Sequence, residues 1–143
     1  MANSLFWRYW APPIFWALVI MALSGDLGSG PKSFSIVNWV LSWFVTLRPD
    51  TLSTINFYVR KVLHVVFYGV LAVLWLRALT ASHPGRAVTN KILALALCLA
   101  VALTDEGHQY VVGSRTASWF DVGLDLSGGV VFLSLALGFT KRK

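Results

Sequence analysis

Long apolar segments constrain the fold of this chain more than any other feature. A helix needs about 20 mostly apolar residues to cross a hydrocarbon core of roughly 30 Å. Four segments approach that length, and they are Phe6–Ser24, Ile55–Leu79, Ile92–Val112 and Trp119–Thr140. Hydrophobic residues make up 57% of the 143-residue chain and charged residues only 13%, whereas ordinary soluble domains carry roughly 25% charged residues. The sequence therefore predicts an all-α polytopic membrane protein, a single domain over residues 1–143 with four transmembrane helices.

A shorter apolar segment, Phe34–Leu47, lies between the first two long segments. As a helix it would rise only about 21 Å, too little to cross the membrane. Its polar residues Asn38, Ser42 and Thr46 recur every four positions and would form one polar stripe. We therefore expect a short interfacial or re-entrant helix here and not a fifth span. The preceding stretch GDLGSGPKS, Gly25–Ser33, is typical of a connecting loop.

The distribution of charge predicts the orientation in the membrane. The N-terminus, the second connection between spans and the C-terminus fall on one side, and their basic residues are Arg8, Arg77, Arg86, Lys91, Lys141, Arg142 and Lys143. The other side holds all the acidic residues, which are Asp26, Asp50, Asp105, Glu106, Asp121 and Asp125. Because cytoplasmic loops carry an excess of Lys and Arg, we expect both termini in the cytoplasm. The predicted location is the cell (inner) membrane.

Charged residues interrupt the apolar segments at the acid-rich end. The run Ile92–Leu103 ends in TDEGHQY, which places Asp105 about 20 Å along its helix from the cytoplasmic end. An ionisable side chain costs about 2.5 to 3.5 kcal/mol at the centre of a membrane helix and less near its edge. Two other segments carry ionisable groups at comparable depth, namely Arg60, Lys61, His64, Asp121 and Asp125. We expect these groups to satisfy one another around an outward-facing polar pocket.

Helical spacing arranges the polar residues in stripes that can face such a pocket. The stripes are Asp105 with His108 and Gln109, Arg60 with His64 and Tyr68, and Asp121 with Asp125. Glu106 lies about 100° round its helix from Asp105, on the side of a neighbouring helix. The sequence thus predicts one cavity shared by His64, Asp105, His108 and Asp121.

Three motifs carry most of these residues: RKVLHVVFYGVL (Arg60–Leu71), DEGHQ (Asp105–Gln109) and SRTASWFDVGLDLSGG (Ser114–Gly129). They resemble the motifs of VanZ-like membrane proteins. The matching positions are Arg60, His64, Tyr68, Asp105, Glu106, His108, Gln109, Arg115, Asp121 and Gly128, together with Ser24 at the end of the first span. Asp125 departs from the pattern, because the family commonly has Asn there. The family is named after a member linked to glycopeptide antibiotic resistance, so the resemblance implies a membrane protein of the cell envelope.

The residue types of the site favour an enzyme that acts on an envelope lipid or a lipid-linked cell-wall intermediate. A histidine oriented by a carboxylate can act as a general base, and two neighbouring carboxylates can supply a general acid. The candidate catalytic residues are Asp105, Glu106, His108, His64 and Asp121. The candidate substrate-binding residues are Arg60, Arg115, Gln109, Tyr68 and Asp125, of which the two arginines could clamp a phosphate or carboxylate.

Other interpretations of the same residues stay open. A non-catalytic protein could bind or transport an amphiphile or glycopeptide at the outer leaflet, and a buried charge network could serve only to hold the helices in register. A metal held by His64, His108, Glu106 and Asp121 is a weaker hypothesis, because no helix carries two ligands at a suitable spacing. The sequence has no glycine-rich phosphate loop, redox cysteine pair or nucleotide fingerprint, so we expect no cofactor and no nucleic-acid partner.

Overall fold

The structure of the chain, a computed structural model, describes residues 5–24, 30–112 and 118–140. In these ranges the chain is helical and has no strand. The elements are the π-helical turn η1 (Phe6–Trp10) and the α-helices α2 (Ala11–Ser24), α3 (Gly30–Ser42), α4 (Pro49–Ser82), α5 (Ala87–Val112) and α6 (Trp119–Thr140). The predicted all-α fold is confirmed.

Four helical stretches of the described chain are long and apolar enough to cross a membrane. They are Phe6–Leu23, Pro49–Ser82, Ala87–Val111 and Trp119–Ala136, and they confirm the four predicted spans. Helix α4 begins before the predicted start at Ile55, because Pro49 occupies its first turn and Asp50 provides a favourable negative charge there. Its 34 residues rise about 51 Å, more than the hydrocarbon core of roughly 30 Å. Helix α4 therefore either tilts or extends beyond the core.

The short helix between the first two spans is present as α3, shifted toward the N-terminus relative to the predicted Phe34–Leu47. It includes Pro31 in its first turn, and after Ser42 the backbone N–H groups of Phe44 and Val45 both bond to the carbonyl of Leu41. The predicted loop Gly25–Ser33 is correspondingly shorter, and its residues 25–29 lie outside the described ranges. The exposed side chains of Trp39 on α3 and of Trp43 and Phe44 just after it make this segment suited to a membrane interface.

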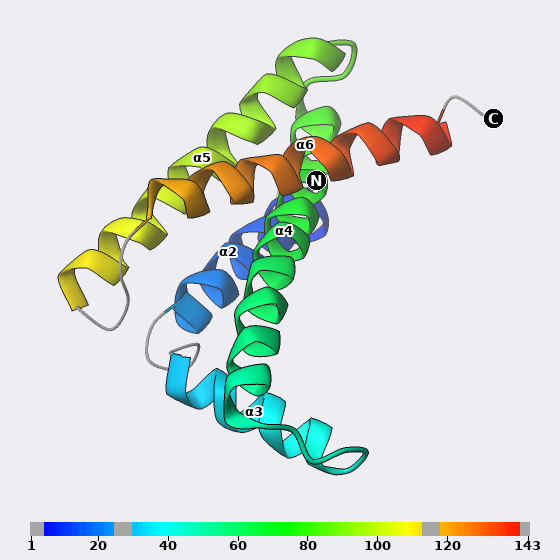
Figure 1. Cartoon of the computed structure of the whole chain (residues 1–143). Helices are drawn as coiled ribbons and strands as arrows, with labels where there is room; N and C mark the ends of the chain where they lie inside the picture. The colour runs from blue at the N-terminus through cyan, green and yellow to red at the C-terminus, as the bar shows by residue number, and fades with distance from the viewer. Residues whose placement is uncertain (1–4, 25–29, 113–117, 141–143) are drawn as a thin grey trace.

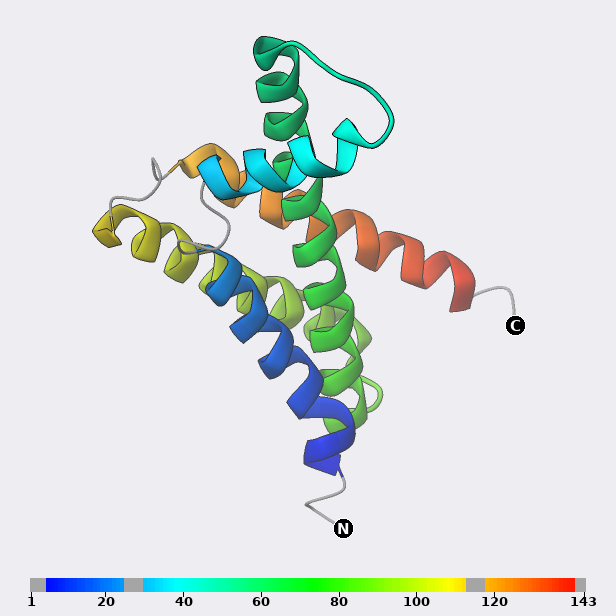
Figure 2. The ribbon, with the colours of Figure 1, turned by 90° about the horizontal axis from the view of Figure 1, so that it is seen from below.

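Helix α4 is the centre of the arrangement, and α2, α3, α5 and α6 all pack against it. Figure 2 shows that η1 and the C-terminal end of α4 lie at the same end of the bundle, whereas α6 crosses α4 and extends away from the other helices. Side-chain contacts hold the first span, η1 and α2, against α4. The indole N–H of Trp10 donates to Oγ of Ser82 over 2.9 Å, and the indole N–H of Trp16 donates to the carbonyl of Phe67 over 3.0 Å.

Small residues allow α4 and α6 to approach closely. A Cβ atom on Gly128 would collide with the backbone of Val65, and one on Gly69 would collide with the ring of Phe132. Around this crossing the core contains Leu71, Ala72, Ala94, Ala102 and the free thiol of Cys98, all fully buried. Because Asp121 and Asp125 precede Gly128 on α6, the crossing sets the height at which these carboxylates meet α4.

Candidate functional site

One ion pair and one histidine–carboxylate hydrogen bond join α4 to α6 near the start of α6. The amino group of Lys61 contacts the carboxylate of Asp121, and Nδ1 of His64 lies 2.9 Å from Oδ1 of Asp125. The side chains of Lys61 and Asp121 are 24% and 14% exposed, whereas those of His64 and Asp125 are 16% and 0% exposed. The His64–Asp125 pair is therefore the inner of two consecutive pairs along the α4–α6 contact.

Helix α5 brings three more polar side chains to this region. Asp105, Glu106 and Gln109 are all buried. Nε2 of Gln109 donates to Oδ2 of Asp105 over 3.3 Å, and Oε2 of Glu106 accepts a bond of 2.6 Å from the backbone N–H of Ser118. Ser118 directly precedes α6, so this bond joins the end of α5 to the beginning of α6.

Polar groups of three helices thus form one buried to partly buried cluster. Asp125 of α6 interacts electrostatically with Asp105 of α5 and with Asp121 of its own helix, and Tyr68 of α4 interacts with Asp105, Asp125 and Glu106. We call this set the polar cluster, and its members are Arg60, Lys61, His64, Tyr68, Asp105, Glu106, Gln109, Asp121 and Asp125.

Several buried oxygen atoms of the polar cluster have no hydrogen-bond partner within the described part of the chain. They are the hydroxyl of Tyr68, Oε1 of Glu106 and Oδ2 of Asp125. Most buried polar atoms in proteins are hydrogen-bonded, so unbonded ones need an explanation. A catalytic role is one such explanation. Here a ligand would find one hydroxyl, which can donate or accept, and carboxyl oxygens that can accept.

The guanidinium group of Arg60 interacts electrostatically with the carboxylate of Asp121 without being bonded to it. Arg60 is partly buried in α4, and it forms no hydrogen bond and no ion pair with any residue that the structure describes. Lys61, by contrast, is bound to Asp121 and also lies 5.3 Å and 5.8 Å from the ring centres of Phe57 and Phe120. The arginine is therefore the cation of the cluster that is available to an anionic ligand.

His108 differs in exposure from the other predicted site residues of α5. His108 is exposed, whereas Asp105 and Gln109 are buried, so His108 is not part of the buried face of α5, and its place around an outward-open cavity stays a prediction. The buried face of α5 is centred between Asp105 and Glu106, as the burial of Ala102 shows, and His108 lies roughly 100° away from that direction. Arg115 lies outside the described residues, and the side chain of Ser24 is not described.

Two residues of α4 were not among the candidate catalytic and substrate-binding residues, although Lys61 was expected near the pocket. Lys61, and not Arg60, is the partner of Asp121, and Asn56 is 8% exposed with its Oδ1 unbonded in the described structure. A signal for Lys61 was available, because Lys61, His64 and Tyr68 have the spacing i, i+3, i+7 that continues into the buried residues of α4. Asn56 lies one turn before Arg60, but nothing in its apolar surroundings distinguished it.

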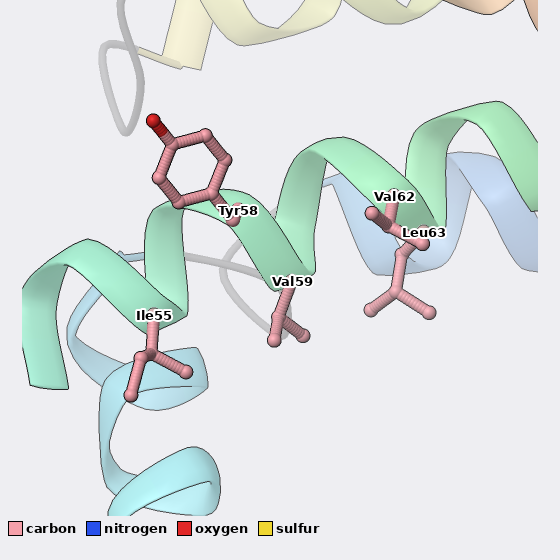
Figure 3. Close-up of a pocket in the computed structure, with 5 residues that line it drawn as sticks. All are labelled: Ile55, Tyr58, Val59, Val62 and Leu63. Carbon is pink, nitrogen blue, oxygen red and sulfur yellow. The ribbon is translucent and has the colours of Figure 1, made fainter.

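The described residues contain no group of three or more His, Cys, Asp or Glu side chains arranged to hold a metal ion. A groove on the surface of α4 is separate from the polar cluster, and its lining residues are Ile55, Tyr58, Val59, Val62 and Leu63 (Figure 3). This groove is apolar and comes from a single helix, as expected for a face that contacts lipid chains.

The fold and the cluster define the class, which is a multi-pass α-helical membrane protein with ionisable residues of three helices gathered in one buried cluster. The chain belongs to the VanZ/LLP1 family, whose model matches residues 9–140. This match confirms the family that the motifs resemble, a family linked to glycopeptide resistance. Neither a curated protein nor a solved structure matches the chain.

Proposed function

We propose that this protein is an enzyme that acts on the head group of an envelope lipid or a lipid-linked cell-wall intermediate. The observation that carries the proposal is the bond between His64 and the fully buried Asp125. A general base needs a fixed tautomer and orientation, and a carboxylate bonded to one ring nitrogen provides both. The position of this pair inside a span matches a substrate whose tails stay in the bilayer.

The chemistry follows from which ring nitrogen is used. A neutral His64 that donates from Nδ1 to Asp125 presents the lone pair of Nε2, which can take a proton from a water molecule or a substrate hydroxyl. The Asp125 carboxylate then stabilises the imidazolium that forms. The buried hydroxyl of Tyr68, one turn along α4, can donate a hydrogen bond to the oxygen on which charge develops.

The guanidinium of Arg60, which forms no hydrogen bond or ion pair with the described residues, favours a substrate that carries an anionic group. Its planar fork can bind a phosphate or a carboxylate with two parallel hydrogen bonds. Arg60 lies one turn from His64 on α4, so an anion held there would leave the rest of the head group near Nε2 of His64. We place the protein in the inner membrane with both termini in the cytoplasm, which puts the polar cluster in the outer leaflet.

Mass spectrometry of envelope lipids and lipid-linked precursors tests this proposal. Cells that lack the protein should accumulate one species and lose another, and the wild-type chain should restore the profile. His64→Gln should fail to restore it. His83→Gln is the matched control, since it makes the same change at an exposed histidine at the other end of α4. His108→Gln should also restore the profile, because the exposed His108 is not a member of the cluster.

An unchanged lipid profile in every strain would reject the enzyme and favour the second candidate, a protein that binds or transports an amphiphile without chemistry. Arg60, without an ion pair in the described part of the chain, favours that candidate equally, because anion binding needs no general base. For a binder, Arg60→Ala would be as damaging as His64→Gln. For an enzyme, His64→Gln should reduce the rate by about 10² to 10⁴-fold while affinity changes much less.

A further inference from the structure

A second group of basic side chains lies at the opposite end of the bundle, around the ring of Tyr9. The Cζ atom of Arg8 is 5.4 Å from the centre of this ring, and the Cζ atom of Arg77 is 5.2 Å from it. Arg8 belongs to η1 and Arg77 to the last turns of α4, so two guanidinium groups from distant parts of the sequence share one aromatic ring. We call Arg8, Tyr9 and Arg77 the Tyr9 site.

The Tyr9 site is held in place by neighbouring contacts. Trp10, the next residue, donates to Ser82 and packs edge to face against Trp75, with ring centres 6.0 Å apart. These contacts fix η1 against the C-terminal part of α4, the region in Figure 2 where the first and second spans meet. The π-helical geometry of η1, closed by the bond from the Ala11 N–H to the Phe6 carbonyl, is rare and occurs frequently at functional sites.

The two guanidinium groups have no anionic partner in the described structure. Both arginines are exposed, and neither forms a hydrogen bond or an ion pair with any described residue. The acidic residues of the described ranges lie at the other end of the bundle, at the start of α4, the end of α5 and the start of α6. The described residues therefore supply no counter-charge to the two guanidinium groups, and an external anion would interact favourably with both.

We propose that the Tyr9 site binds the phosphate of an anionic phospholipid. Arg8 is near one end of the first span and Arg77 near one end of the second, so both lie where phosphate groups of a bilayer occur. Basic sites between membrane helices on the cytoplasmic side bind anionic head groups, and guanidinium forks match phosphate oxygens. Phe6 and Trp7, which are 45% and 71% exposed, supply aromatic surface at the same level, as interfacial residues do.

Native mass spectrometry of the full chain tests the site. The protein is taken from nanodiscs that contain phosphatidylcholine and phosphatidylglycerol in equal parts, and the lipids that stay bound are counted. The wild-type chain should retain phosphatidylglycerol in preference to phosphatidylcholine. Arg8→Gln and Arg77→Gln should each lower this preference by about fivefold, the effect of about 1 kcal/mol per basic residue near a membrane surface.

Arg86→Gln is the matched control, because it removes a basic residue at the same end of the bundle that takes no part in the Tyr9 site. The preference of this variant for phosphatidylglycerol should equal that of the wild type. Arg77→Lys keeps the charge but loses the planar fork, so a partial loss is expected. Equal preference in the wild type and in both Gln variants would overturn the proposal.

Competition identifies the source of the phosphate. Inorganic phosphate and glycerol phosphate, added at millimolar concentration, should leave the bound phosphatidylglycerol in place if the lipid is the ligand. Displacement by either soluble compound would overturn the assignment to a lipid. Because both arginines are exposed, the variants should unfold at the wild-type temperature in phosphatidylcholine alone. If Arg77→Gln unfolds at a lower temperature than the wild type in phosphatidylcholine, the lipid preference of Arg77→Lys is used in its place. A wild-type preference in Arg77→Lys would then overturn the role of the guanidinium fork.

Discussion

Nδ1 of His64 lies 2.9 Å from Oδ1 of Asp125, and the Asp125 side chain is fully buried. The two residues come from different membrane-spanning helices, α4 and α6. A buried carboxylate without a partner is costly in such a position, and the imidazole is the hydrogen-bond partner of Oδ1. The pair therefore combines a structural role, since it joins two helices, with the geometry of an oriented base.

Substitutions in this pair should differ in their effect on stability. His64→Leu leaves the Asp125 carboxylate buried and unpaired, a change that typically costs about 3 to 5 kcal/mol. Asp125→Leu leaves Nδ1 of His64 without its hydrogen-bond partner, at about 1 to 3 kcal/mol. Asp125→Asn keeps an acceptor oxygen and should cost least. Reversible unfolding in mixed micelles measures the order, and a larger loss for Asp125→Asn than for His64→Leu would contradict it.

The outer pair, Lys61 and Asp121, should show coupling in a double-mutant cycle. Lys61→Met and Asp121→Asn each leave one charge uncompensated in a partly buried position. The double variant should be more stable than the sum of the two losses predicts, by about 0.5 to 3 kcal/mol. Asp50 lies exposed at the start of α4, so Lys61→Met combined with Asp50→Asn is the control and should be additive. Additive behaviour of both pairs would mean that the Lys61–Asp121 contact contributes nothing.

The fold could be predicted from the sequence because the membrane imposes it. Backbone groups in a bilayer must be paired within the segment, so apolar runs of sufficient length become helices. The family could be predicted because its motifs are spread over most of the chain. The ends of the helices were harder to predict from the sequence, since Pro49 begins α4 and Pro31 is in the first turn of α3. Local capping decides such boundaries, and hydropathy does not report it.

Which polar residues join the cluster depends on how far each helix is rotated about its own axis. The periodicity of the sequence alone does not fix that rotation. Asp105, His108 and Gln109 share one half of a helical wheel, but the direction of the core falls toward Glu106 and leaves His108 exposed. Similarly, of the adjacent Arg60 and Lys61, it is Lys61 that forms the described ion pair with α6. The α4–α6 crossing at Gly128 and Val65 sets these directions, and a crossing is a tertiary property. The catalytic and binding roles of the cluster stay predictions.

Gly128→Ala should disrupt the crossing itself. A Cβ atom there would meet the carbonyl group of Val65, which belongs to the backbone and cannot rotate away. Overpacking of this kind costs about 1 to 3 kcal/mol, and it should also separate His64 from Asp125. Gly123→Ala is the control on the same helix, because its Cβ would meet nothing within 4 Å. Thermal unfolding in detergent should distinguish the two variants, and equal stability would show that α4 and α6 do not approach this closely.

The orientation of the bundle decides which leaflet supplies the substrate. The end of the chain that holds the Tyr9 site carries basic residues without acids, and the end that holds the polar cluster carries both. Because basic loops stay in the cytoplasm, a reporter that is active only outside the cytoplasm should give a signal when it is fused after Gly113. The same reporter should be silent after Lys143, and a cytoplasmic reporter at each position should give the complementary result. A signal after Lys143 and none after Gly113 would move the polar cluster to the inner leaflet. The substrate would then have to be a lipid or precursor on the cytoplasmic side, and the anionic lipid of the Tyr9 site would belong to the outer leaflet.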